Sequence, residues 1–135
     1  MKAMQYSGYY LLVTGLIHNL IGLAMGWPIL VAMHQDGWLF STVVNGQMAF
    51  DREAISWFLF TGVFWMLFGL MLQKALNEGF NPPLSLGWGF IVIGTMIAVI
   101  MPASGAYLFI IQGIILVIGA SRKAQAELMV ESNAT

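Results

Sequence analysis

The chain has 135 residues, of which 59% are apolar and only 8% carry a charge. A soluble globular domain carries about 25% charged residues, so this composition cannot cover a water-facing surface. The net charge of −1 gives the chain no general attraction to nucleic acid or to acidic substrates. Because the sequence has no cysteine, disulfides, iron–sulfur clusters, thiolate zinc sites and cysteine nucleophiles are excluded.

Long apolar segments predict an all-α integral membrane protein. A helix needs about 20 apolar residues to cross a hydrocarbon core about 30 Å thick, and backbone amides in lipid must be satisfied within the helix. Segments free of Asp, Glu, Lys and Arg cover residues 8–33, 54–72, 84–101 and 105–120. We therefore expect a four-transmembrane-helix domain over residues 1–120, followed by a polar C-terminal tail over residues 121–135.

Basic residues near the ends of the expected spans predict the orientation. An even number of spans places both termini on one side, and that side carries four basic residues, Lys2, Lys74, Arg122 and Lys123. The opposite side carries Arg52 alone. Because cytoplasmic loops are enriched in Lys and Arg, we expect both termini to be cytoplasmic.

Glycines spaced seven apart predict how the helices pack. Seven residues make about two helical turns, so each pair marks one helix face, and small residues let helix backbones approach closely in lipid. Such a repeat favours a left-handed bundle. The expected packing glycines are Gly15, Gly22, Gly26, Gly62, Gly69, Gly87, Gly94, Gly105 and Gly119.

Few polar residues lie inside the expected spans, and depth counting at about 1.5 Å per residue places four of them near the midplane. They are His18, Gln112, Thr95 and Trp65. One interpretation is a structural layer of interhelical hydrogen bonds. The other is a pocket for a proton, a quinone-like headgroup or a metal cofactor. The sequence leaves both open, with His18 facing a neighbouring helix in either case.

The connection over residues 34–53 is too apolar for a free aqueous loop, and we expect it to lie on the interface or to fold back over the bundle. At its end, Asp51, Arg52 and Glu53 form the densest charge cluster. Helix chemistry explains it, with Asp51 as N-cap and Glu53 at the positive end of the helix dipole. A second interpretation is an outer-face binding site that also contains Asp36, His34 and Ser104.

No cofactor or metal site is predicted, although haem and quinone ligands are left open. His18 and His34 are sixteen residues apart, roughly 24 Å along one helix, so they cannot share one iron within the chain. A single axial ligand, or ligation across an oligomer interface, is compatible with the sequence.

The sequence resembles an uncharacterised bacterial membrane protein family, domain-of-unknown-function family 6463, over most of residues 7–120. The shared motifs are Gly15-Leu16-Ile17-His18, then Arg52-Glu53-Ala54 followed by Trp57-Phe58, and Met101-Pro102-Ala103-Ser104-Gly105. The resemblance implies four helices and a bacterial membrane, and it implies no activity. At the level of the fold the chain is also similar to DoxX-like small membrane proteins, which have suggested links to quinones.

These observations favour a non-enzymatic membrane module or accessory subunit in the bacterial inner membrane. Its expected partners are the lipid bilayer and either further copies of the chain or another membrane subunit, with no nucleic acid. The alternatives are a binder or carrier of a quinone-like or haem-like lipophilic molecule near His18, and a small proton-coupled transporter. The transporter is less favoured because no acidic residue lies inside the spans. An enzyme is not favoured, because no Ser/His/Asp constellation or phosphate loop is visible.

Overall fold

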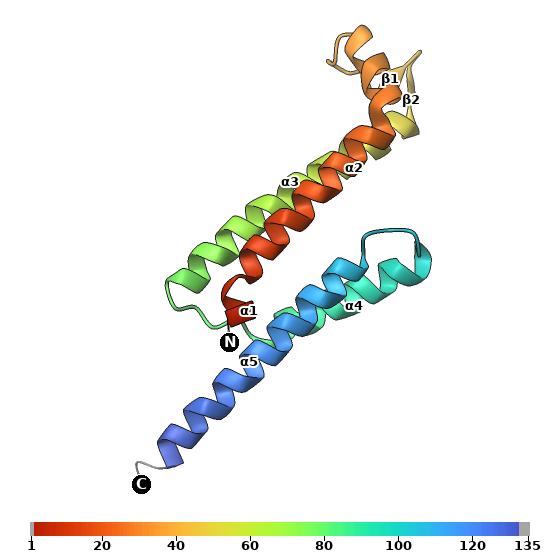
Figure 1. The fold of residues 1–135 in the computed structure, drawn as a ribbon. Coiled ribbons are helices and arrows are strands. Elements are labelled where there is room, and N and C mark those ends of the chain that lie inside the picture. Colours follow the sequence, from red (N-terminus) through yellow and green to blue (C-terminus); the bar gives the residue numbers. More distant parts are fainter. Residues whose placement is uncertain (1, 133–135) are drawn as a thin grey trace. The chain divides into compact units, whose positions relative to one another are not determined.

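The computed structural model describes residues 2–132, and most of them are helical (Figure 1). The helices are α1 (Lys2–Gln5), α2 (Ser7–Gln35), α3 (Phe50–Asn77), α4 (Leu84–Ile100) and α5 (Tyr107–Ser132). Two short strands, β1 (Val43–Val44) and β2 (Gln47–Met48), lie between α2 and α3. Residues 12–67 form one compact unit, which we call the central unit, and the described residues before and after it form the terminal unit.

Among residues 2–132, three helices are long and apolar enough to cross a membrane. They are α2, α3 and the stretch of α5 from Tyr107 to Val130. Each extends past the end of the apolar segment expected from the sequence. Helix α5 continues to Ser132, so the first part of the polar C-terminal tail extends the last helix.

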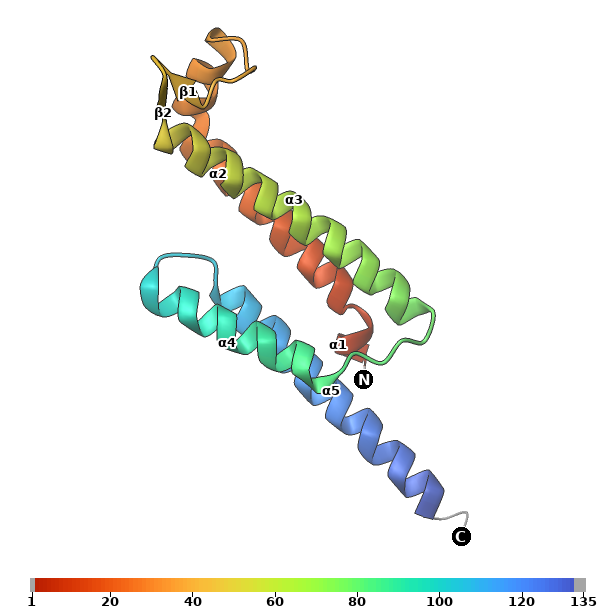
Figure 2. The same ribbon diagram turned by 180° about the vertical axis from the view of Figure 1, so that it is seen from behind.

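Helix α4 is the shortest of the four apolar helices that the structure describes. Its 17 residues span about 25 Å at about 1.5 Å per residue, a few ångströms less than a hydrocarbon core about 30 Å thick. It ends at Ile100, and α5 begins at Tyr107, two residues later than the expected start at residue 105. In both views α4 lies alongside α5 (Figure 1, Figure 2).

Helices α2 and α3 end in the same way, through a glycine in the left-handed region. After α2, Gly37 has φ +87°, its N–H donates to His34 O, and the Trp38 N–H donates to Met33 O. After α3, Gly79 has φ +88° and lies in an equivalent pair of backbone hydrogen bonds. These paired bonds form the Schellman motif, in which glycine avoids the clash that a Cβ would cause.

A tight hairpin lies in the loop between α2 and α3. Strand β1 pairs antiparallel with β2, with Val44 opposite Gln47. The two turn residues, Asn45 (φ +53°) and Gly46 (φ +75°), both have positive φ, as a type I′ turn requires. The interpretation of this loop as an irregular interfacial segment missed the hairpin, although Asn-Gly is the strongest short signal for such a turn.

In the central unit, α2 and α3 run side by side and contact each other through glycines (Figure 1, Figure 2). A Cβ built at Gly15 would lie 2.7 Å from the Gly62 carbonyl oxygen. One at Gly22 would lie 2.6 Å from Phe58 Cδ1, and one at Gly26 would collide with the side chain of Ile55. The glycine face of α2 therefore lies against α3, so the backbones approach more closely than alanine would allow.

In the terminal unit, α4 and α5 also approach through glycines. A Cβ at Gly94 would lie 2.9 Å from Ile110 Cγ1, and one at Gly87 would lie 2.9 Å from the Gly113 carbonyl oxygen. The expected partner position on α5, Gly105, differs from this pattern. Gly105 is exposed in the turn before α5, and a Cβ there would meet no atom within 4 Å. Gly113 occupies the contact instead, because the helix starts later than expected and Gly105 never joins its face.

The remaining expected glycines contact the N-terminal segment within the same unit. A Cβ at Gly119 would lie 2.5 Å from the sulfur of Met4 in α1. Gly69 is buried, and its carbonyl oxygen lies 2.5 Å from where Gly8 would carry a Cβ. Helix α1 and the first turn of α2 thus pack against α5 and the end of α3.

Candidate functional site

His18 lies in the interface between α2 and α3 of the central unit. Its Nε2 atom lies 3.0 Å from the Phe58 carbonyl oxygen, and its ring stacks on the Phe58 ring at 3.7 Å between centroids. Because a carbonyl can only accept, Nε2 carries the proton in this hydrogen bond. The ring of Trp65 lies 4.6 Å away, tilted by 48°. The structure thus brings His18 and Trp65 together, two of the four residues expected in the polar layer.

Asn19 lies against α3, the helix that His18 also contacts, and this contact was not predicted from the sequence. Its side-chain oxygen occupies the place where Gly62 lacks a Cβ, and this buried oxygen has no hydrogen-bond partner among the described residues. Adjacent helix positions point about 100° apart, so His18 and Asn19 contact α3 on either side of one contact line.

Gln112 is fully buried in the terminal unit, where it contacts the start of α2. Its Nε2 donates to the Ser7 hydroxyl at 2.6 Å and to the Ser7 carbonyl at 3.1 Å. Its Oε1 atom has no partner among the described residues. The sequence expectation gave Gln112 a place beside His18. Its hydrogen bonds in the structure instead hold the first residue of α2.

A second glutamine, Gln73, holds the same helix end. Its Oε1 accepts the Tyr9 N–H at 3.2 Å, and its Nε2 donates to Gln5 O at 2.8 Å and Asn77 Oδ1 at 2.9 Å. The first four N–H groups of any helix lack partners within it. Gln73, which lies on α3, therefore caps the N-terminal end of α2. The sequence shows no sign of this cap, because the break at Tyr6 that creates the helix end is visible only in the structure.

Thr95 hydrogen-bonds within its own helix. It is exposed on α4, and its hydroxyl donates to Ile91 O, one turn back in its own helix, at 2.7 Å. Thr61 does the same on α3, with Trp57 O at 2.7 Å. A threonine hydroxyl can be satisfied by its own helix in this way. The depth of a threonine in an expected span therefore does not indicate its hydrogen-bond partner.

Arg52 organises the outer-face cluster. Its guanidinium pairs with the Asp36 carboxylate at 2.7 Å and donates to the Ser41 carbonyl at 2.7 Å. Its side chain is only 13% exposed. Asp51 and Glu53 lie in the first turn of α3, which begins at Phe50, so Asp51 is not the N-cap that the sequence suggested. Arg52, in the first turn of α3, thus links the start of α3 to Asp36 and Ser41 in the loop after α2.

Ser104 and His34 were the other expected members of this cluster. Ser104 belongs to the terminal unit, where its hydroxyl oxygen accepts the Ala106 N–H at 3.4 Å just before α5. His34 belongs to the central unit, and its Nδ1 accepts the indole N–H of Trp38 at 3.0 Å. Across residues 2–132, the structure groups no three His, Asp or Glu side chains closely enough to hold a metal ion.

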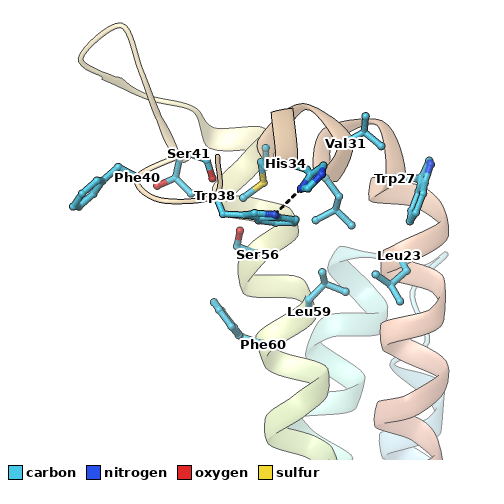
Figure 3. A pocket seen from close by; sticks show the side chains of 13 residues that line it. Leu23, Trp27, Val31, His34, Trp38, Phe40, Ser41, Ser56, Leu59 and Phe60 are labelled. Carbon is cyan, nitrogen blue, oxygen red and sulfur yellow. Dashed lines mark hydrogen bonds between the residues drawn. The ribbon is translucent and has the colours of Figure 1, made fainter. Parts of the chain in front are cut away.

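A hollow of about 690 Å³ opens in the central unit where α2, α3 and the loop meet (Figure 3). Ligand pockets commonly measure 300–1,000 Å³, so this volume suits a small molecule. Figure 3 shows the indole of Trp38 extending toward His34, with Leu23 and Leu59 pointing into the space between the helices. His18 is not among the residues that line it. The only hint in the sequence was the apolar character of residues 34–53.

The comparisons with known proteins agree with the resemblance drawn from the sequence motifs. The model of a family of unknown function, DUF6463, matches residues 2–123, which is nearly the whole chain. Neither the curated proteins nor the solved structures give a match.

Proposed function

We propose that this chain, which belongs to the DUF6463 family of unknown function, is a non-enzymatic membrane module with four transmembrane helices. One observation carries the proposal: His18 and Gln112, two polar side chains within the helices, hydrogen-bond to neighbouring parts of the fold. His18 bonds Phe58 O on α3, and Gln112 bonds Ser7 at the start of α2. Polar side chains used in this way stabilise helix contacts, and few polar groups within the helices are then left for catalysis.

The four-span arrangement rests on α4 as well as on the three long helices. Helix α4 packs along α5 through Gly87 and Gly94, so the two form a hairpin like that of α2 and α3. A helix of 17 residues crosses a bilayer when the membrane thins locally by a few ångströms. The repeated glycine spacing favours a left-handed bundle.

Charge supports cytoplasmic termini in the bacterial inner membrane. With four spans, Lys2, Lys74, Arg122 and Lys123 fall on the side of the termini, and Arg52 falls on the opposite side. Arg52 is paired with Asp36, which reduces its weight as an outer charge. Lipid surrounds the module, and its further partner is a second copy of the chain or another membrane subunit.

Reporter fusions test the topology. A periplasm-only reporter fused after Thr135 should be inactive, and the same reporter inserted at Gly46, in the hairpin turn, should be active. The reverse pattern would invert the orientation. Equal activity at both sites would show an odd number of spans and remove α4 from the membrane.

The absorption spectrum and lipid extract of the purified protein test the non-enzymatic module against the cofactor-binding alternative. A featureless visible spectrum, together with a discrete oligomer by light scattering, supports the module. A haem band or a co-purified quinone would instead select the second function considered from the sequence, binding of a lipophilic molecule. One volume that could hold such a molecule is lined in part by His34, and His18 is not among its lining residues.

A further inference from the structure

The loop between α2 and α3, residues 36–49, presents large apolar side chains on its outer surface. Trp38 is 53% exposed, Leu39 is 77% exposed and Phe40 is 79% exposed. We call these three consecutive residues the apolar loop face. Figure 3 shows the Phe40 ring extending outward from the loop, away from the helices. Apolar groups of this size, gathered at one place, indicate a surface that meets something other than water.

The backbone holds this face outward in an unfavourable conformation. Trp38 (φ +55°) and Phe40 (φ +57°) lie in the left-handed region, which bulky side chains rarely adopt. Two hydrogen bonds fix the start of the segment: the Trp38 N–H donates to Met33 O, and its indole N–H donates to His34 Nδ1, both at 3.0 Å. In water, turning Leu39 and Phe40 inward would stabilise the loop, so their outward position indicates an apolar environment.

The charges on α3 determine the depth of this loop when the helix spans a membrane. Residues 54–73 of α3 include no Asp, Glu, Lys or Arg, and at about 1.5 Å per residue they extend for about 30 Å. That length matches a hydrocarbon core about 30 Å thick. With Lys74 at one boundary of the core, Arg52 therefore lies at the other boundary.

Arg52 ties the loop to this boundary. Its guanidinium contacts the Asp36 carboxylate at 2.7 Å and donates to the Ser41 carbonyl oxygen at 2.7 Å. Asp36 and Ser41 flank the apolar loop face in the sequence. The face between them therefore lies near the level of Arg52, where acyl chains meet lipid headgroups.

The composition of the loop suits that level. Residues 37–50 include no Asp, Glu, Lys or Arg, and the nearest charges, Asp36 and Arg52, neutralise each other. Tryptophan is enriched at membrane interfaces, and Trp57, in the second turn of α3, is exposed close to the same boundary. A face without charge fits the lipid interface itself and has no group to select an anionic headgroup.

We propose that the apolar loop face is a membrane anchor that inserts into the lipid interface, and that Arg52 sets its depth. Trp38, Leu39 and Phe40 contact the boundary between headgroups and acyl chains. The sequence left open whether this connection lies on the interface or folds back over the bundle, and the exposure of the face together with the depth of Arg52 favours the interface. The inference rests on the proposed membrane placement and adds to it an attachment of the loop to one leaflet.

Spin labels on the full-length protein in phosphatidylcholine vesicles test the anchor. Because the chain has no cysteine, each introduced cysteine carries a nitroxide at one known position. Leu39→Cys and Phe40→Cys label the face, and Gln125→Cys labels the exposed polar part of α5. Power saturation in electron paramagnetic resonance compares collisions with O₂, which concentrates in lipid, and with a water-soluble nickel chelate. We expect O₂ collisions to dominate at positions 39 and 40, within about 5–10 Å of the headgroup–acyl boundary, and nickel collisions to dominate at position 125.

Matched variants test what sets the depth. In the Leu39→Cys protein, Arg52→Gln should move the label toward water, raising nickel collisions and lowering O₂ collisions, because the loop loses its contacts with the guanidinium. Lys74→Gln removes an exposed basic residue at the other end of α3 and should change neither. Replacing part of the phosphatidylcholine by anionic phosphatidylglycerol should leave the depth unchanged, because the face carries no charge.

Two collision patterns at positions 39 and 40 would overturn the anchor. Nickel collisions that equal or exceed O₂ collisions would place the face in water. Few collisions with either reagent would show that protein covers the face, either a second copy or another part of the chain. An unchanged depth in Arg52→Gln would overturn the role of Arg52, and insertion only with anionic lipid would overturn the uncharged interface as the partner.

The reporter fusions on the same variants keep this anchor and the proposed topology apart. Inverted topology with labels at lipid depth would reject the orientation alone. The expected topology with labels in water would reject the anchor alone.

Discussion

Gly113, which lies against α4, and Gly105, which lies in the turn before α5, provide a sharp test of glycine packing. A Cβ at Gly113 would lie 2.5 Å from the Gly87 carbonyl oxygen and 2.9 Å from the Ile91 backbone nitrogen. Backbone atoms cannot move aside as a flexible side chain can, so Gly113→Ala must push α4 and α5 apart. A Cβ at Gly105 would meet nothing within 4 Å.

The two substitutions should therefore differ in sign. Overpacking typically costs about 1–3 kcal/mol, and alanine recovers up to about 1 kcal/mol of helix propensity, so Gly113→Ala should destabilise by roughly 0–2 kcal/mol. Gly113→Leu should destabilise more. Gly105 is not among the described glycines with positive φ, so Gly105→Ala should be neutral or stabilise by about 0.4–1 kcal/mol through the unfolded state.

Unfolding in mixed micelles, followed by the helical circular dichroism signal against the mole fraction of SDS, measures the difference. We expect the midpoint to fall for Gly113→Ala and Gly113→Leu, and to stay or rise for Gly105→Ala. Adding Gly87→Ala to Gly113→Ala should give less than the sum of the two effects, because one separation of the helices relieves both clashes. A midpoint for Gly113→Leu as high as that of the wild type would refute the close approach of α4 and α5.

Three further substitutions test other parts of the fold. Gly37→Ala should destabilise the protein by about 1–2 kcal/mol in the same titration, because the φ of Gly37 is +87°. The control Gly89→Ala, on open α4 surface, should not destabilise it. A neutral Gly37→Ala would reject the glycine-capped end of α2. His18→Leu should lower stability by about 0.6 kcal/mol, the average for an interhelical hydrogen bond, and a loss of several kcal/mol would point to a larger role. Arg52→Ala should speed proteolysis of the loop over residues 36–50 in intact vesicles, and an unchanged cleavage rate would show that Arg52 does not fasten it.

The helical fold, with helices long and apolar enough to cross a membrane, could be predicted because it depends on properties that the sequence displays directly. Charge-free segments of helical length have one favourable form in lipid, and glycines at two-turn spacing identify contact faces. The prediction worked for Gly15 and Gly22, which contact α3, and missed at Gly105. Spacing alone cannot tell a glycine on a helix face from one in the turn before it, and the start of α5 at Tyr107 decides between them.

The partners of the polar residues could not be predicted, because they depend on backbone breaks and local bonds. Gln112 bonds Ser7, whose position at the start of α2 follows from a break near Tyr6 that no strong sequence signal marks. Thr95 bonds its own helix. The hairpin could have been predicted, because Asn45-Gly46 is a strong turn signal. The prediction for this loop considered its hydropathy alone.

The environment of Ser41 shows why the surroundings of a side chain are harder to predict than a fold. Its hydroxyl is unremarkable in sequence, since serine is common in loops. It becomes informative when Arg52 holds its carbonyl and the loop buries its side chain in the lining of an apolar hollow. His18 shows the reverse: a conspicuous residue in the sequence whose bond to Phe58 O accounts for its position.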